Sequence, residues 1–144
     1  MRIRKLSHSV YQVQYHIVWG TKYRRKFLKH YVRKELVKSL YKIQRRYPSW
    51  YIHRVNTAND HVHLLIEYPP KYSGSEVVRV LKSSTSRDLR SSFSFIRGMY
   101  EESGGIWSVG YFLSTVGLNE VQIRKYIDKQ NSYDRGIDLT SEFS

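Results

Sequence analysis

The sequence predicts an α+β fold, a ferredoxin-like (RRM-like) antiparallel sheet with helices on one face and a C-terminal helix on the other. Three observations lead to this prediction: strand-like alternation of apolar residues in some segments, helical spacing in others, and the element order β-α-β-β-α-β-α. At 144 residues the chain is expected to fold as one domain, 1–144, in which residues 131–144 form a polar tail.

The first half of the chain predicts two strands and one helix. Residues 10–19 (VYQVQYHIVW) alternate between apolar and polar side chains, which is typical of a half-buried strand. From about 24–47 the apolar residues recur at helical spacing, and Pro48 marks the end of this helix. A second strand is expected over about 50–56, followed by an Asn-Asp turn.

The segment His61–Glu67 (HVHLLIE) predicts a third strand with two chemically different faces. Side chains alternate along a strand, so Val62, Leu64 and Ile66 share the face expected to pack against the helices. His61 and His63 lie on the other face, and only the last helix is left to cover them.

The second half of the chain completes the element order. Ser73 or Ser75 can cap a helix over about 76–89. The remaining elements are an irregular, partly helical connection over 91–105, a fourth strand over 106–115 (IWSVGYFLST) and a last helix over about 118–130.

The charge balance predicts a polyanionic partner. Lysine and arginine number 25 against 12 acidic residues, which gives a net charge of +13 and a pI near 10.0. A field of this sign and size attracts nucleic acid. An anionic membrane surface is the rival, but it requires an amphipathic helix that the core does not use, and the sequence shows none.

Two basic regions are candidate DNA contacts. One comprises the start of the chain and the loop after the first strand, the other the outer face of the second helix. The residues proposed to bind DNA are Arg4, Lys5, Lys22, Arg24, Arg25, Lys26, Arg79, Lys82 and Arg87.

Targeting signals and cysteines are both lacking. The N-terminus has no apolar stretch typical of a secretory signal, so a cytoplasmic location is expected. Because the chain has no cysteine, any metal must be held by histidine, carboxylate or amide side chains.

The two strand histidines and the last helix together suggest a metal site beside a nucleophile. His61 and His63 can converge on one metal ion, although a pair of hydrogen-bonded strand residues is the simpler interpretation. In the last helix, Tyr126 and Gln130 lie one turn apart. Gln130 would complete a His-His-Gln site with Tyr126 as nucleophile, whereas the simpler role for Tyr126 is to pack its ring on the sheet.

The chain resembles the HUH-type, single-tyrosine transposases of prokaryotic insertion sequences (the IS200/IS605 group, including repeat-associated tyrosine transposases). The resemblance covers residues from about 11 to 130. Five motifs carry it, in the order and spacing of that family: YHIVWGTKYRRK, NDHVHLLIE, SSTSRDLR, IWSVGYFLSTVG and VQIRKYIDKQ.

The resemblance implies a specific activity. His61 and His63 would be the HUH pair, Gln130 the third ligand of Mg²⁺ or Mn²⁺, and Tyr126 the nucleophile. The expected reaction is single-stranded DNA cleavage and strand transfer through a 5′-phosphotyrosine, at element ends marked by hairpins. The family works as a homodimer in which the tyrosine helix of one subunit completes the site of its partner.

Two other functions are compatible with the sequence. The first is a non-catalytic nucleic-acid-binding module of RRM-like fold, with Tyr11, Tyr15 and Trp19 as stacking residues. The second is DNA cleavage by the same chemistry without transposition, as in a domesticated HUH endonuclease or a rolling-circle replication initiator.

Overall fold

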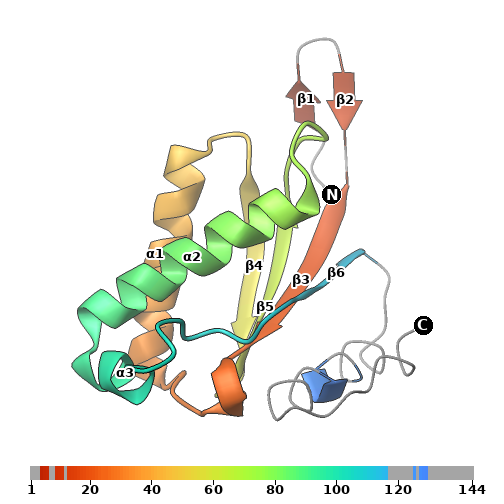
Figure 1. Cartoon of the computed structure of the whole chain (residues 1–144). Coiled ribbons are helices and arrows are strands. Elements are labelled where there is room, and N and C mark those ends of the chain that lie inside the picture. The colour runs from red at the N-terminus through yellow and green to blue at the C-terminus, as the bar shows by residue number, and fades with distance from the viewer. Residues whose placement is uncertain (1–3, 7–8, 12, 117–124, 126, 130–144) are drawn as a thin grey trace.

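Four antiparallel strands form the central sheet of the protein (Figure 1). The computed structural model describes residues 4–6, 9–11, 13–116, 125 and 127–129. The strands are β3 (Gln14–Gly20), β4 (Tyr51–Thr57), β5 (His61–Glu67) and β6 (Phe112–Thr115). Their order across the sheet is β4-β5-β3-β6. The two central strands, β3 and β5, are the first and third of these four strands in the sequence. This order confirms the predicted ferredoxin-like fold.

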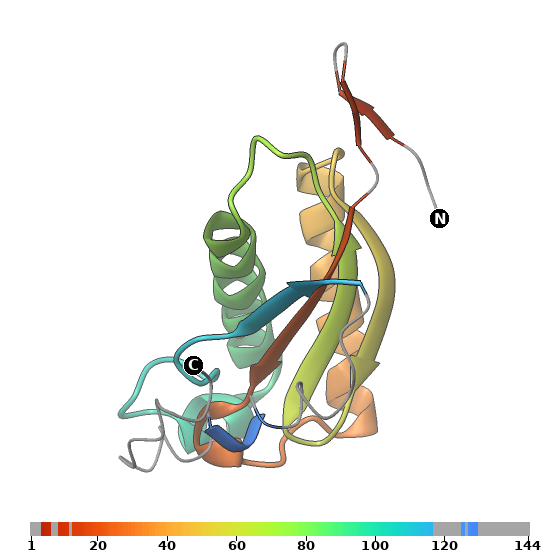
Figure 2. The ribbon, with the colours of Figure 1, turned by 90° about the vertical axis from the view of Figure 1, so that its right-hand side faces the viewer.

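The helices α1, α2 and α3 lie on one side of this sheet (Figures 1 and 2). Their bounds are His30–Arg46, Gly74–Ser92 and Ser94–Met99. A separate hairpin of β1 (Arg4–Leu6) and β2 (Ser9–Tyr11) projects beyond the end of β3. Within the described part of the chain, no helix combines the length and apolar character needed to cross a membrane.

The main core lies between the sheet and the helices. Ile17 and Trp19 of β3 are fully buried there, as are the alternate apolar residues of β5, namely Val62, Leu64 and Ile66. The two central strands therefore present to the helices the faces that their alternation predicted. Burial of large apolar side chains is the main favourable term in folding, so this layer fixes the sheet against the helices.

The second helix begins with a complete capping box. The Ser73 hydroxyl accepts a hydrogen bond from the Glu76 backbone N–H (3.1 Å), and the Glu76 carboxylate accepts one from the Ser73 N–H (3.2 Å). Of the two serines proposed as caps, Ser73 therefore has this role. The helix continues to Ser92, three residues beyond its predicted end, and α3 is the helical part of the connection expected to be irregular and partly helical.

The first helix starts later than predicted. A helix was expected from about residue 24, but α1 begins at His30. The residues before it form a 3-10 turn, η1 (Lys22–Arg24), followed by an extended segment. Phe27 and Leu28 are buried in that segment. The Leu28 N–H donates to the Asn59 carbonyl oxygen (3.0 Å), a bond that helical geometry would not allow. The prediction placed the helix start too early because Phe27 fits the helical spacing of apolar residues, although Phe27 and Leu28 enter the core from an extended backbone.

The fourth strand is shorter than predicted, because only Phe112–Thr115 pair with β3. Trp107 forms an isolated bridge to Thr21, and Gly110 has a φ of 86°, which interrupts the extended conformation. The Lys82 ammonium donates to the carbonyl oxygens of Ser108 (2.6 Å) and Gly110 (2.8 Å). These bonds fix residues 106–110 to α2 as a strap rather than as a strand.

One residue from the end of the chain, Ile127, contacts the opposite face of the sheet, where the last helix was expected. Val18 of β3 is fully buried on this face and packs against Phe112 and Ile127. Residues 125 and 127–129 are helical. The predicted tail and most of the predicted last helix lie outside the described residues.

Asp88 should stabilise the contact between α1 and α2. Its carboxylate accepts hydrogen bonds from the buried Ser39 hydroxyl (2.6 Å) and from Lys42 (3.3 Å). We expect Asp88→Ala to lower the free energy of unfolding at neutral pH by about 1–2 kcal/mol, because the Ser39 hydroxyl loses its acceptor. Chemical denaturation measures this loss, and Glu35→Ala is the control because Glu35 has only an exposed ion pair with Lys38.

The same contact predicts the pH dependence of that loss. Burial opposes ionisation of Asp88, but the bonds from Ser39 and Lys42 outweigh it and hold the Asp88 pKa below 3.8. The stabilisation is therefore present above about pH 4 and is lost as the pH falls through the folded-state pKa. An Asp88→Ala difference that stays constant down to pH 2 would contradict this assignment.

Candidate active site

His61 and His63 lie on the sheet face that the three helices leave open. Both are half-buried, and they alternate along β5 with core residues that are fully buried. In the register between β3 and β5, Val18 faces His63 and Gly20 faces His61. The histidines therefore lie beside the buried Val18, against which Ile127 packs.

A third histidine, which the sequence analysis did not select, joins this face. Nδ1 of His16 lies 2.9 Å from Nε2 of His63, and the ring centroids are 5.0 Å apart. Burial, assisted by the positive charge of Arg54, lowers the pKa of His16 below 6.5. A neutral imidazole has one donor and one acceptor nitrogen, so the two rings can share one proton.

Pairing between strands explains why His16 was missed. Its alternation with Ile17 already placed it on the polar side of the first strand. Only the antiparallel pairing of β3 with β5, which are 40 or more residues apart along the chain, brings it beside His63. A ferredoxin-like strand order applied to the sequence would have been the signal that could find it.

Asp60 orients His61 from the turn before β5. Its Oδ1 lies 2.9 Å from Nδ1 of His61. Burial opposes ionisation of Asp60, but hydrogen bonds from His61 and Arg24 outweigh it and hold the Asp60 pKa below 3.8. An ionised carboxylate can only accept, so Nδ1 of His61 donates to Asp60 and Nε2 is the ring nitrogen that this bond does not use. This carboxylate–histidine arrangement is typical of metal-binding imidazoles.

Arg24 connects this turn to the end of the chain. Its guanidinium donates to Oδ2 of Asp60 from Nε (2.9 Å) and Nη2 (2.7 Å). Its Nη1 donates to the carbonyl oxygen of Ile127 (3.2 Å). A continuous series of polar contacts thus runs from His61 through Asp60 and Arg24 to the residue next to Tyr126 in sequence.

The structure describes the predicted histidine ligands but not the two predicted site residues of the last helix. Tyr126 and Gln130 lie outside the described residues. Among the residues that the structure describes, no three His, Asp or Glu side chains come together as a metal-binding group. The site therefore combines two contacts on one face of the sheet, His16 with His63 and His61 with Asp60, and Arg24 links Asp60 to Ile127.

Comparison with known proteins decides the family. Residues 9–130 match the family described as "Transposase IS200 like". This match spans most of the chain and includes His16, His61, His63, Tyr126 and Gln130. The chain belongs to the IS200-like transposase family.

Individual relatives agree with this membership. The transposase for insertion sequence element IS200 of Salmonella typhimurium is 33% identical over 135 residues, which are 92% of this chain and 86% of that protein. The ISDra2 transposase TnpA of Deinococcus radiodurans is 30% identical over 132 residues, covering 91% and 93% of the two chains.

Solved structures show the same fold. A crystal structure of a candidate transposase from Deinococcus radiodurans superposes with a TM-score of 0.77 at 28% identity, covering 88% of this chain and 97% of the other. A REP-associated tyrosine transposase, solved bound to a REP hairpin, has a TM-score of 0.52 at 16% identity and shares the fold. It covers 86% of this chain and 68% of the other.

The basic residues of this IS200-like transposase differ in what they contact. Arg25 and Lys26 are exposed in the loop after β3, and Arg79 and Arg87 are exposed on α2. Arg24, Arg25 and Lys82 bond to groups of the protein itself. Lys22 is half-buried in the same loop, and Arg4 and Lys5 lie in β1. Their contacts with DNA stay predictions.

Arg24 should hold the chain end against the histidine face. We expect Arg24→Gln to increase amide hydrogen exchange at Ile127, Asp128 and Lys129, because the charged donor to the Ile127 carbonyl is lost. The free energy of unfolding should fall by about 1–2 kcal/mol. The control is Arg45→Gln, which removes an exposed charge from α1. Unchanged exchange at these three amides in Arg24→Gln would contradict the role.

Proposed function

We propose that this IS200-like transposase cleaves and rejoins single-stranded DNA through a covalent bond between Tyr126 and a 5′-phosphate. The observation that carries the proposal is the contact of Ile127 with Val18 on the face that holds His16, His61 and His63. It brings the sequence neighbour of the only tyrosine in the last predicted helix to the histidines. The family membership of the chain supports the same chemistry.

The donor set fits a divalent metal ion. The bond from Nδ1 of His61 to Asp60 leaves Nε2 of His61 as the nitrogen for ligation, an arrangement common among metal-binding histidines. We propose His61, His63 and Gln130 as ligands of Mg²⁺ or Mn²⁺, with nitrogen-rich ligation favouring Mn²⁺. The ion would neutralise charge that develops on the scissile phosphate.

The proposed reaction uses Tyr126 as the nucleophile that attacks a phosphate of the DNA. The Tyr126 oxygen would attack phosphorus, forming the phosphotyrosine ester, while the bond to the 3′-oxygen breaks and leaves a free 3′-hydroxyl. A free tyrosine has a pKa of about 10, so roughly one phenol in a thousand is ionised at neutral pH. The attacking phenol must therefore pass its proton to a neighbour or to water. The 3′-hydroxyl of another DNA end can later attack the phosphorus of this ester. That step joins the two DNA ends and releases the Tyr126 hydroxyl without ATP.

Hairpin-marked DNA is the proposed substrate. The structural relative that was solved with a REP hairpin shares the fold of this chain. The exposed Arg25 and Lys26, beside the histidine end of the sheet, supply cations for phosphates. We propose that the hairpin is bound by shape and that cleavage occurs in the adjacent single strand.

For the alternative of a non-catalytic RRM-like module, two of the three proposed stacking residues belong to the core or pack against it, and the side chain of Tyr11 lies outside the described residues. Trp19 is 0% exposed, and Tyr15 packs against the main core and stacks on Tyr68 at 4.5 Å. Both rings face the helices rather than a bound strand. The proposal therefore stays with the enzymatic function.

Homodimerisation, and which chain supplies Tyr126 to a given site, stay predictions. Ile127 packs against Val18 and accepts a hydrogen bond from Arg24 of its own chain. We propose a homodimer whose active sites are shared between subunits, as in the family that the chain resembles, with the tyrosine helix of one subunit completing the site of its partner.

A covalent adduct tests the proposed reaction. Incubation with labelled single-stranded hairpin DNA and Mn²⁺ should give a protein–DNA adduct on a denaturing gel. Tyr126→Phe and addition of a chelator should each abolish it, and His63→Ala should reduce it by at least about a hundredfold. Tyr133→Phe, a tyrosine in the predicted tail, is the matched control. Hairpin binding without any adduct would favour a binding module instead.

Mixing two inactive chains tests which subunit supplies the tyrosine. Tyr126→Phe and His61→Ala chains, each without adduct, should stay inactive when combined if Tyr126 acts in cis. Restored cleavage in the mixture would show that the tyrosine helix of one chain serves the histidines of another.

A further inference from the structure

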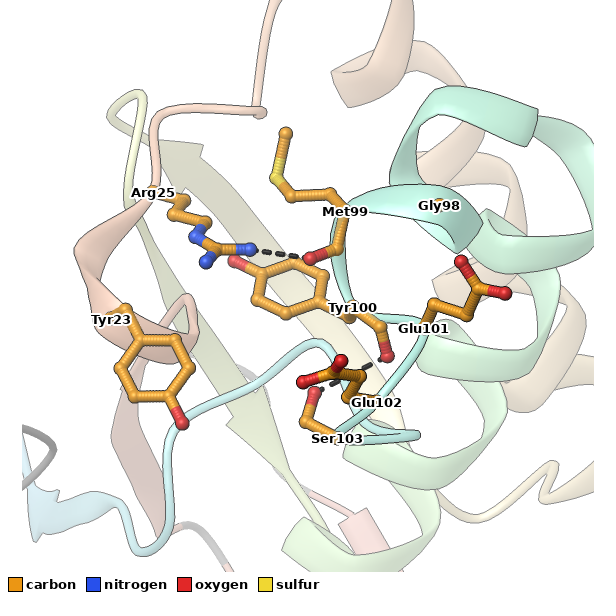
Figure 3. Close-up of a pocket in the computed structure, with 8 residues that line it drawn as sticks. All are labelled: Tyr23, Arg25, Gly98, Met99, Tyr100, Glu101, Glu102 and Ser103. Atoms are coloured by element: carbon orange, nitrogen blue, oxygen red, sulfur yellow. Dashed lines mark hydrogen bonds between the residues drawn. The ribbon is translucent and has the colours of Figure 1, made fainter.

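A hollow of about 440 Å³ opens beside the histidine end of the sheet (Figure 3). Its lining comes from the loop after β3 and from the end of α3 with the turn that follows: Tyr23, Arg25, Gly98, Met99, Tyr100, Glu101, Glu102 and Ser103. It adjoins the candidate active site, because the Thr21 N–H donates to the Asp60 carbonyl oxygen (2.9 Å) and Arg24 binds the Asp60 carboxylate.

Two tyrosine rings and a guanidinium form one wall of this hollow. The guanidinium carbon of Arg25 lies 5.4 Å from the centroid of Tyr23 and 5.1 Å from that of Tyr100. Arg25 also donates to the Met99 carbonyl oxygen, and the Tyr100 hydroxyl donates to the Lys22 carbonyl oxygen (2.7 Å). Arg25 and Tyr100 are thus fixed in place, whereas the ring of Tyr23 is 45% exposed.

The exposed position of Tyr23 is maintained by unfavourable backbone angles. Tyr23 has a φ of 60° and Arg24 a φ of 54°, although neither is glycine. Two successive residues of this kind are costly and persist only where surrounding contacts hold them. The Arg24–Asp60 ion pair and the bond from Tyr100 to the Lys22 carbonyl are those contacts.

An acidic side chain faces this aromatic wall. Figure 3 shows the Glu102 carboxylate on the side of Tyr23 and Tyr100, while the Glu101 carboxylate points the other way, toward Gly98. A carboxylate repels phosphate and accepts hydrogen bonds from N–H groups. Of the four DNA bases, only guanine presents two adjacent N–H donors, N1–H and the N2 amino group, on its Watson–Crick edge.

We propose that the hollow binds an unpaired guanine of the single-stranded DNA substrate. The base stacks on Tyr23 and Arg25, and its Watson–Crick edge donates to Glu102. Lys22 and Lys26 flank the hollow in sequence and supply cations for the neighbouring phosphates. This inference rests on the proposed function and adds to it a base-specific subsite next to the histidines.

Binding of short oligonucleotides tests the subsite. The probes are fluorescein-labelled oligothymidine and the same strand with one central guanine, inosine or adenine, measured by fluorescence anisotropy at fixed salt. Wild-type protein should bind the guanine strand about tenfold more tightly than oligothymidine, because of the paired hydrogen bonds. Inosine, which lacks the N2 amino group, and adenine should lose most of this preference.

Matched variants assign the effect to named side chains. Glu102→Gln should abolish the guanine preference, whereas Glu101→Gln removes the same charge next to it and should keep the preference. Tyr23→Ala should weaken binding of the guanine strand about tenfold, and Tyr23→Phe should restore it, because stacking needs only the ring. Thermal unfolding of each variant separates loss of the subsite from loss of the fold.

The outcomes separate this inference from the proposed function. Equal affinity of the wild type for all strands, or a guanine preference that survives Glu102→Gln, overturns the subsite. If the covalent adduct still forms in that case, the proposed cleavage stands. A guanine preference that Glu102→Gln removes establishes the subsite, even if no hairpin yields an adduct and cleavage must be abandoned.

Discussion

The antiparallel pairing of β3 with β5 is the constraint on which the rest of the structure depends. Its register places Val18 opposite His63 and Gly20 opposite His61, and it thereby brings His16 within hydrogen-bond distance of His63. A shift of one residue would turn the histidines toward the helices and the core residues toward the open face. The buried side chains on the helix side exclude that shift, so the hydrophobic core also specifies the geometry of the candidate active site.

The same two strands explain how the protein combines a stable core with an ionisable site. One face of the pair is dry and closed by α1 and α2, and the other holds three imidazoles that stay partly exposed. Asp60 and Arg24 provide the polar support on this second face, and Ile127 covers Val18 from the end of the chain. The proposed nucleophile and metal ligands would lie on this second face.

The loop after β3 connects the candidate site with the rest of the surface. Arg24 points from it toward Asp60, while the neighbouring Tyr23 and Arg25 line the hollow beside Tyr100. The strap over 106–110 closes the same end of the sheet, where Ser108 donates to the carbonyl oxygens of Gly20 and Thr21. Cleavage chemistry and recognition of the flanking strand would therefore share one rigid edge. A substitution in this loop is expected to affect both.

The fold class, the two faces of each strand and the resemblance to the family can be inferred from the amino-acid sequence alone. Alternation and helical spacing are local properties, so the core face of His61–Glu67 could be inferred without coordinates, and the cap of α2 could be narrowed to Ser73 or Ser75. The tertiary structure decided what depends on distant segments. It placed His16 beside His63, started α1 at His30 because Phe27 and Leu28 enter the core from an extended backbone, and engaged Arg24 and Lys82 within the protein. These features arise from pairing and packing between residues far apart in the chain, which periodicity along the sequence cannot specify.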